Sequence, residues 1–222
     1  MNGKVDLQPK APYEVQPAMV FVEPAKEEKR RKKQGQAFLD FPVGRSVLLP
    51  DYRRNPEELA NIRDAMAEVQ NNPDVEIMGL FVEGYASPEG RYATNEKLSN
   101  ERASALKDYM KTTFGMPESM FKVGYVAEDW EGLRALIEES EINYKPEIIA
   151  AIENTADPDA REAKIKSLKG GAPYRVMLKD MFPQLRRVEY QIDYSIKDFT
   201  VEKIKTMIGS KDEMLSQLEF WQ

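Results

Sequence analysis

The sequence predicts an α+β fold in which a β-sheet has helices packed on it. Three observations support this prediction. Apolar and polar residues alternate strictly over 188–196, as in a half-buried strand. Apolar residues recur at helical spacing over 55–70 and 94–114. Strand-like and helical segments also alternate along the chain, in the order β-α-β-α-β-helices-β, which favours layers of sheet and helix.

Four segments are rich in β-forming residues and are expected to be strands: 36–49, 75–86, 121–126 and 188–196. In 75–86, apolar residues occupy both alternation classes, which is typical of a central strand covered on at least part of both faces. The last strand, 188–196, is expected to bury one face and to leave the other in water.

Two long helices are expected between the first three strands. The first begins with Asn55 as N-cap and Pro56 at the first helical position, and Asn71-Asn72-Pro73 ends it. The second runs over 94–114. Residues 131–182 predict four shorter helices. Residues 200–222 predict a final helix whose apolar end is exposed.

Composition excludes many kinds of chemistry. The 222 residues include 32 Lys plus Arg and 38 Asp plus Glu, but no His and no Cys. The chain therefore has no Ser-His-Asp or Cys-His pair, no histidine zinc site, no thiol chemistry and no disulfide. No spacing among the 38 acids singles out a catalytic carboxylate pair. We expect no enzyme activity, cofactor or metal.

The N-terminal 35 residues differ from the rest. They hold four prolines and the charge run 26–33, and carry 8 basic and 5 acidic residues in a chain of net charge −6. An extended arm is expected, with a short edge strand at 19–22. The basic run either contacts an anionic surface or is a solvated turn or linker, and the second interpretation is favoured.

The chain offers no sign of a membrane span or of nucleic-acid binding. It has no run of about 20 apolar residues. Its acidic balance argues against a nucleic-acid partner. Its N-terminus lacks the apolar region of a signal peptide, so we expect either a cytosolic protein or a fragment that begins after its export signal.

One constellation predicts a binding site. The stretch 84–90 covers the end of the second strand and the turn 87–90, and the next helix carries Asn95, Ser99 and Arg102 on one face. Arg102 also borders the buried stripe of that helix, where a guanidinium needs a partner. This arrangement indicates a pocket for an anion or polar ligand. The alternative, favoured on spacing alone, is that Arg102 bonds carbonyls or Glu89 and locks the turn.

Two acidic clusters have a simpler interpretation. Glu128 and Asp129 follow the third strand and either rim the same site or bind a cation that prefers oxygen ligands. A helix N-cap at Asp129 is the favoured interpretation. Asp157-Pro158-Asp159 is similarly interpreted as the start of a helix.

The constellation resembles a known family. The glycines of the turn, followed by Asn95, Leu98-Ser99 and Arg102-Ala103, resemble the C-terminal, peptidoglycan-associating domain of OmpA-like proteins. Phe38-Leu39-Asp40-Phe41 and Arg186-Arg187-Val188-Glu189 resemble the openings of that family's first and last strands. The resemblance covers 36–130 and 183–197. The turn and its surroundings look more specifically like a branch in uncharacterised Bacteroidales envelope proteins.

The resemblance implies a set of site residues. In the family, an aspartate at the strand end holds the diaminopimelate amine of peptidoglycan, and an arginine on the next helix holds its carboxylate. The arginine corresponds to Arg102 and the family's asparagine to Asn95, but Ser87 occupies the aspartate position. Glu89 is the candidate substitute. Arg186 and Arg187 either join this pocket or form an exposed pair at a strand start.

The resemblance also implies a function. We expect a non-catalytic cell-envelope binding module that tethers an outer-membrane or surface protein near peptidoglycan, in the periplasm or at the outer membrane. Ser87 argues against direct peptidoglycan binding. The alternative is a protein–protein interaction module in envelope or surface-appendage assembly, with other envelope proteins as partners and a purely structural pocket.

The expected domains are an N-terminal arm over 1–35, an OmpA-like domain over 36–198 with a helical insertion at about 131–182, and a tail over 199–222 that leads to a further module.

Overall fold

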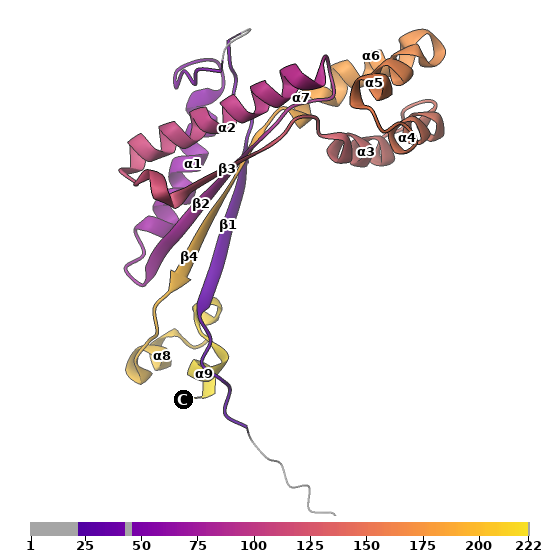
Figure 1. Ribbon diagram of the computed structural model, residues 1–222. Coiled ribbons are helices and arrows are strands. Elements are labelled where there is room, and N and C mark those ends of the chain that lie inside the picture. The colour runs from indigo at the N-terminus through magenta and orange to yellow at the C-terminus, as the bar shows by residue number, and fades with distance from the viewer. Residues whose placement is uncertain (1–21, 43–45, 222) are drawn as a thin grey trace, which may run out of the picture. The chain divides into compact units, whose positions relative to one another are not determined.

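The computed structural model describes residues 22–42 and 46–221 (Figure 1). The chain divides into two compact units. One unit is Glu28–Asp198, and it holds the sheet and the candidate site. The other combines Met1–Glu27 with Phe199–Gln222. The expected edge strand at 19–22 lies outside the described residues except for Val22, which belongs to no strand.

The sheet has four strands: β1 (Lys29–Ala37), β2 (Val75–Tyr85), β3 (Phe121–Val126) and β4 (Val188–Ile196). Their order across the sheet is β1-β4-β2-β3. β4 runs antiparallel to both neighbours, whereas β2 and β3 are parallel. This mixed sheet with helices packed on it confirms the predicted α+β class.

The first strand is not where the sequence predicts it. β1 begins in the basic run and pairs with the whole of β4, from Lys29 opposite Ile196 to Ala37 opposite Val188. The predicted strand 36–49 is therefore wrong beyond residue 37. Side chains of the following helix bond this segment instead, because Asn55 Oδ1 accepts from the Asp40 amide at 2.7 Å and Asn55 Nδ2 donates to the Asp40 carbonyl.

Two helices cover one face of the sheet. α1 (Asn55–Gln70) and α2 (Tyr92–Phe114) bury apolar stripes against β1, β4 and β2. The shared core consists of Ala37, Leu39, Leu59, Ile62, Met66, Val69, Leu80, Val82, Ala103, Leu106, Met110, Val188, Tyr190 and Ile192. Asn55 is the first residue of α1 and does not cap it; its side chain holds the preceding segment.

A glycine permits the close approach of α2 to β2. A Cβ added at Gly84 would lie 2.1 Å from the Ser99 carbonyl oxygen, far inside van der Waals contact. The start of α2 therefore lies directly against the end of β2. This contact fixes where Asn95 and Arg102 stand relative to the turn that follows the strand.

The second face of the sheet carries no helix among the described residues of the unit Glu28–Asp198. Phe81 and Glu83 of β2 point to this face and are half-buried. The sequence predicts cover on part of both faces of β2, but the helices cover only one. We call this second side the open face.

The segment that the sequence predicts to be an insertion, called the insertion below, contains α3 (Trp130–Glu139), α4 (Lys145–Glu153), α5 (Pro158–Ser167), α6 (Ala172–Asp180) and the short α7 (Phe182–Leu185). The four expected helices are present, and α7 is additional. Asp129 and Asp157 cap α3 and α5, as predicted. The insertion has a core of its own, formed by Leu133, Ile137, Ile148, Ala151, Ile152, Ile165, Tyr174, Met177, Met181, Phe182 and Leu185.

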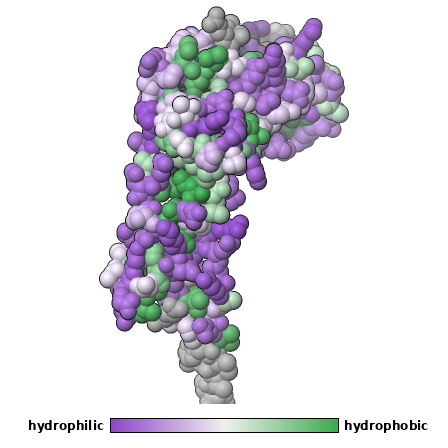
Figure 2. Space-filling model, turned by 60° about the vertical axis from the view of Figure 1, so that its left-hand side comes forward, coloured by the Kyte–Doolittle hydropathy of each residue, from purple (hydrophilic) through white to green (hydrophobic). Residues whose placement is uncertain are grey.

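The C-terminal residues form α8 (Val201–Met207) and α9 (Gln217–Trp221), so the single expected helix over 200–222 is wrong. Gly209 interrupts it with φ +80°. Phe220 and Trp221 are exposed, as the sequence predicts. Figure 2 shows hydrophilic residues over much of the visible surface, with hydrophobic ones in smaller groups between them. No helix in the described part of the chain is long and apolar enough to cross a membrane.

Candidate functional site

The candidate site begins where β2 and β3 end. The Ala86 amide donates to the Val126 carbonyl at 3.1 Å, and the Asp129 amide donates to the Ala86 carbonyl at 3.0 Å. These bonds hold the C-terminal ends of β2 and β3 together. Ser87 follows directly and is buried, and Gly90 closes the turn with φ +91°, a conformation that favours glycine.

Arg186 binds both residues expected to replace the family's aspartate. Its Nε donates to Ser87 Oγ at 2.9 Å, and its Nη2 forms an ion pair with the Glu89 carboxylate. Glu89 is thus paired with an arginine of the same chain, in an ion pair whose two side chains are 39% and 42% exposed. An incoming ammonium group would have to compete with a guanidinium that is already in place.

Arg102 lies close to this pair but has no acidic partner among the described residues. Its guanidinium stacks over the Phe41 ring, 5.2 Å from the centroid, and its Nε is buried without a hydrogen-bond partner there. Burial, and then the positive charge of Arg186, lowers the pKa of Arg102 below its usual range. The expectation that Arg102 bonds Glu89 is wrong, because Arg186 holds that carboxylate.

Arg187 serves a different contact. Its Nη1 donates to Asp129 Oδ2 at 2.6 Å, its Nε donates to Glu189 at 2.7 Å, and it stacks 4.1 Å from the Tyr85 ring centroid. Burial opposes its charge, but the bonds to Asp129 and Glu189 outweigh burial and raise the pKa of Arg187. The interpretation of 186–187 as an exposed pair is therefore wrong for Arg187, whose side chain is 14% exposed.

Asn95 connects the turn to the next strand exit. Its Nδ2 donates to the Glu89 carbonyl at 3.1 Å and to Glu128 Oε1 at 3.0 Å. The second Glu128 oxygen accepts from Trp130 Nε1 at 2.8 Å. Burial is the main reason that the pKa of Glu128 is raised. Asn95 thus positions the turn by its amide.

Residues 41–135 match the OmpA family. The match spans β2, the turn, α2 and β3, and so includes Ser87, Asn95 and Arg102. Arg186 and Arg187 lie outside it. No curated protein matches the chain. The match supports an OmpA-like domain, a kind of non-catalytic binding domain associated with the envelope and with peptidoglycan.

Two acids of the insertion complete the surroundings of the turn. Glu162 Oε1 accepts from the Gly90 amide at 3.0 Å, from the Tyr174 hydroxyl at 2.5 Å and from Lys166 Nζ at 2.9 Å. Asp159 Oδ1 accepts from the Tyr92 amide at 2.9 Å.

Sequence reasoning misses Glu162 and Asp159 as partners of the turn. Acids on a charged helix normally indicate a solvated surface, and nothing local links α5 to a turn about seventy residues earlier. The burial of Glu162 is a consequence of tertiary packing.

The site offers hydrogen-bond and charge recognition. The described residues contain no group of three or more His, Cys, Asp or Glu side chains placed to hold a metal ion. Of the six predicted residues, the structure brings Ser87, Glu89 and Arg186 into direct contact and places Arg102 beside them. Asn95 supports the turn through its amide, and Arg187 bonds elsewhere.

Proposed function

We propose that this chain is a cell-envelope binding module in which Arg102 holds a carboxylate of the peptidoglycan stem peptide. The observation that carries the proposal is the buried Nε of Arg102, which lacks a partner among the described residues. A buried polar group without a partner costs about 1–3 kcal/mol, and more if charged. A carboxylate ligand would bind the accessible part of the guanidinium with charge-assisted hydrogen bonds and offset the burial of its charge.

The same geometry argues for recognition of the carboxylate alone. Ser87 carries no charge, and the Glu89 carboxylate is paired with Arg186. The amine of diaminopimelate therefore finds no unpaired acid in the turn. We propose that binding rests on one arginine, in a module that tethers an outer-membrane or surface protein near peptidoglycan.

A second candidate function is a protein–protein interaction module in envelope or surface-appendage assembly. The Arg186–Glu89 ion pair favours it, because this pair fills the place where the family's ligand amine would bind. Under this alternative the turn is structural, and the partner binds on another surface.

Co-sedimentation with purified peptidoglycan sacculi separates the two functions. The wild type is expected to sediment with the sacculi, and Arg102→Ala is expected to lose at least about tenfold in affinity, the equivalent of about 1.4 kcal/mol. Arg134→Ala is the matched control, because Arg134 is a half-exposed arginine of α3 that pairs only with Glu138 and Glu153.

Failure of the wild type to sediment would overturn direct binding, and full retention by Arg102→Ala would move the site elsewhere. Calorimetric titration of diaminopimelate into the wild type and Ser87→Asp tests the amine position. We expect Ser87→Asp to bind diaminopimelate more tightly, because the new carboxylate would pair with the ammonium group of the ligand.

The remaining finer assignments stay predictions. They are the periplasmic or outer-membrane location, the Bacteroidales branch, and the division into arm, OmpA-like domain and tail. Fractionation of the native host would test the location.

A further inference from the structure

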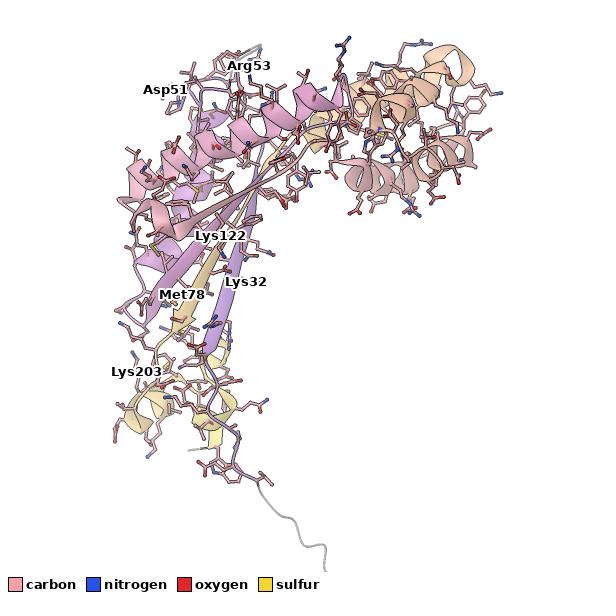
Figure 3. All side chains as sticks on the ribbon, viewed as in Figure 1. Lys32, Asp51, Arg53, Met78, Lys122 and Lys203 are labelled. Carbon is pink, nitrogen blue, oxygen red and sulfur yellow. The ribbon has the colours of Figure 1, made fainter. Side chains whose placement is uncertain are left out.

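A groove crosses the open face of the sheet, on the side away from α1 and α2. It has a volume of about 390 Å³ and takes residues from all four strands. The side chains that matter below are Arg30, Lys32, Met78, Phe81, Lys122 and Asp193. Figure 3 labels one of them on each of β1, β2 and β3, namely Lys32, Met78 and Lys122. We call this the open-face groove.

The basic run of the sequence supplies one margin of the groove. Successive side chains of a strand point to opposite faces, so only alternate residues of the run reach the open face. Lys33 points to the helices and pairs with Glu68 of α1. Arg30 and Lys32 are exposed on the opposite side and line the groove.

The acid of the groove forms no ion pair with the cations of the groove among the described residues. Asp193 stands opposite Lys32 in the β1–β4 pair, yet its Oδ1 accepts from Gln191 Nε2 at 2.7 Å, and no ion pair joins it to Lys32 within the described chain. Lys122, on the other margin, likewise has no acidic partner among the described residues. Among the described residues Arg30 pairs only with Glu28, and both side chains are exposed, so this bond is weak.

The floor between the two margins carries two apolar side chains of β2, Met78 and Phe81, beside the acid Asp193 of β4. Met78 occupies a β-bulge, since Ile77 and Gly79 pair with consecutive residues of β4, and its side chain is 52% exposed. Phe81 lies beside it, opposite Lys122 in the β2–β3 pair. The groove thus presents Met78 and Phe81 on β2, one acid on β4, and positive charges on both outer strands.

The dimensions and charges fit one kind of occupant. β1 and β3 are the outer strands of the four-stranded sheet, so the two basic margins stand about 14 Å apart. An α-helix with its side chains is about 10–12 Å wide. A helix with an apolar stripe and acidic flanks would bury the stripe on Met78 and Phe81 and place carboxylates beside the lysines.

We propose that the open-face groove binds an acidic amphipathic helix of a partner protein. This interaction surface is separate from the candidate site that contains Arg102, and it does not depend on the proposed function of that site. Cations on an edge strand also discourage edge-to-edge pairing of sheets. That role alone would explain the basic residues of β1 without a partner protein. The experiment must therefore measure binding to the face.

Fluorescence anisotropy with a labelled synthetic helix tests the proposal on the full chain. The probe is a 16-residue peptide with leucines at helical spacing and glutamates flanking them, and the comparison peptide carries lysines in place of the glutamates. We expect the acidic probe alone to bind. Its affinity should fall about tenfold between 50 and 300 mM salt, because the charges lie in solvent.

Charge reversal locates the site. Lys32→Glu combined with Lys122→Glu is expected to weaken binding of the acidic probe by at least about tenfold. Lys164→Glu combined with Lys179→Glu is the matched control, because it makes the same charge change at exposed lysines of the insertion. Met78→Ser replaces an apolar side chain of the groove floor and changes no charge, so it should weaken binding about threefold. Circular dichroism and elution volume check that each variant is folded.

Several outcomes would overturn the proposal. Equal weakening in the control double variant would show non-specific attraction. If the acidic probe does not bind the wild type, the cations serve only to discourage edge-to-edge pairing of sheets. Binding to vesicles that contain phosphatidylglycerol, without binding to the peptide, would assign the face to an anionic lipid surface. The salt dependence of probe binding to the wild type tests the proposal even if a variant fails to fold.

Discussion

The unit Glu28–Asp198 contains two hydrophobic cores that are built in different ways. The sheet core joins residues distant in sequence, from Ala37 to Ile192. The insertion core draws on one continuous segment, from Leu133 to Leu185. Polar bonds link the insertion to the turn after β2, among them Glu162 to Gly90 and Asp159 to Tyr92. Apolar packing therefore holds each body together, and hydrogen bonds orient the site between them.

This difference assigns different roles to similar-looking residues. A buried leucine in either core contributes mainly through the apolar area it removes from water. A buried acid such as Glu162 contributes little net free energy. It fixes geometry, because the groups that donate hydrogen bonds to its carboxylate must all keep their positions. Changes in the cores should cost stability, and changes in the polar contacts should mainly alter the turn.

The largest effect is expected in the sheet core. Leu106→Ala on α2 removes a fully buried side chain, and it should lower the free energy of unfolding by about 3–5 kcal/mol through lost burial and a residual cavity. Urea denaturation followed by circular dichroism measures this loss. Val176→Ala, at an exposed position, is the control and should change stability by less than about 0.5 kcal/mol. A loss below about 1 kcal/mol for Leu106→Ala would contradict the sheet core as described.

A smaller and more local effect is expected in the insertion core. Ile148→Ala on α4 should cost about 2 kcal/mol, near the lower end for such changes, because short helices can shift toward the cavity. Hydrogen exchange should then speed up across 130–185 and leave β2 and β4 protected. Equal acceleration in both regions would show that the two cores unfold as one.

The polar contacts are tested by removing a single hydroxyl. Tyr174→Phe deletes the donor to Glu162 but keeps the edge-to-face contact with Phe182, and it should cost about 1 kcal/mol. Tyr144→Phe, at an exposed tyrosine, is the control. If both variants lose the same amount in urea denaturation, the Tyr174 hydroxyl does not stabilise Glu162, the acid that bonds the turn at Gly90.

The smallest expected effect is a pH dependence. Burial raises the pKa of Glu128, so the folded protein favours the protonated carboxyl. The stabilisation from this group is complete below the ordinary pKa of glutamate and is lost as pH rises through the raised pKa. The stability of the wild type relative to Glu128→Gln should therefore fall from pH 4 to pH 8. Glu131→Gln, at an exposed glutamate, should show no such trend. A wild type that gained stability relative to Glu128→Gln as pH rises would contradict the raised pKa.

Local patterns predicted much of the fold. The helices α1 and α2 and the strands β2, β3 and β4 lie where periodicity indicates them. The spacing of apolar residues within each short segment is enough to predict which face is buried. The caps at Asp129 and Asp157 are also local, since each side chain bonds an amide three residues ahead. Arg102 could be placed on the correct face of its helix for the same reason.

The errors share one cause. Residues 36–49 are rich in strand formers, yet the edge strand forms from the basic run. Its nine residues pair with all nine residues of β4, and the Asn55 side chain bonds the competing segment at Asp40 instead. The pairing of Arg186 with Glu89 joins residues 97 positions apart, and Arg102 Nε is left without a partner among the described residues.

The sequence by itself therefore determined the class of fold, the helix that carries Arg102 and the absence of histidine and cysteine chemistry. The tertiary structure decided which acid Arg186 neutralises, which buried acids hold the turn, and which alternate cations of the basic run face the open side of the sheet. The physical reason is that periodicity and capping act between near neighbours. Charge pairing and strand order are instead settled by a competition among groups that only folding brings together.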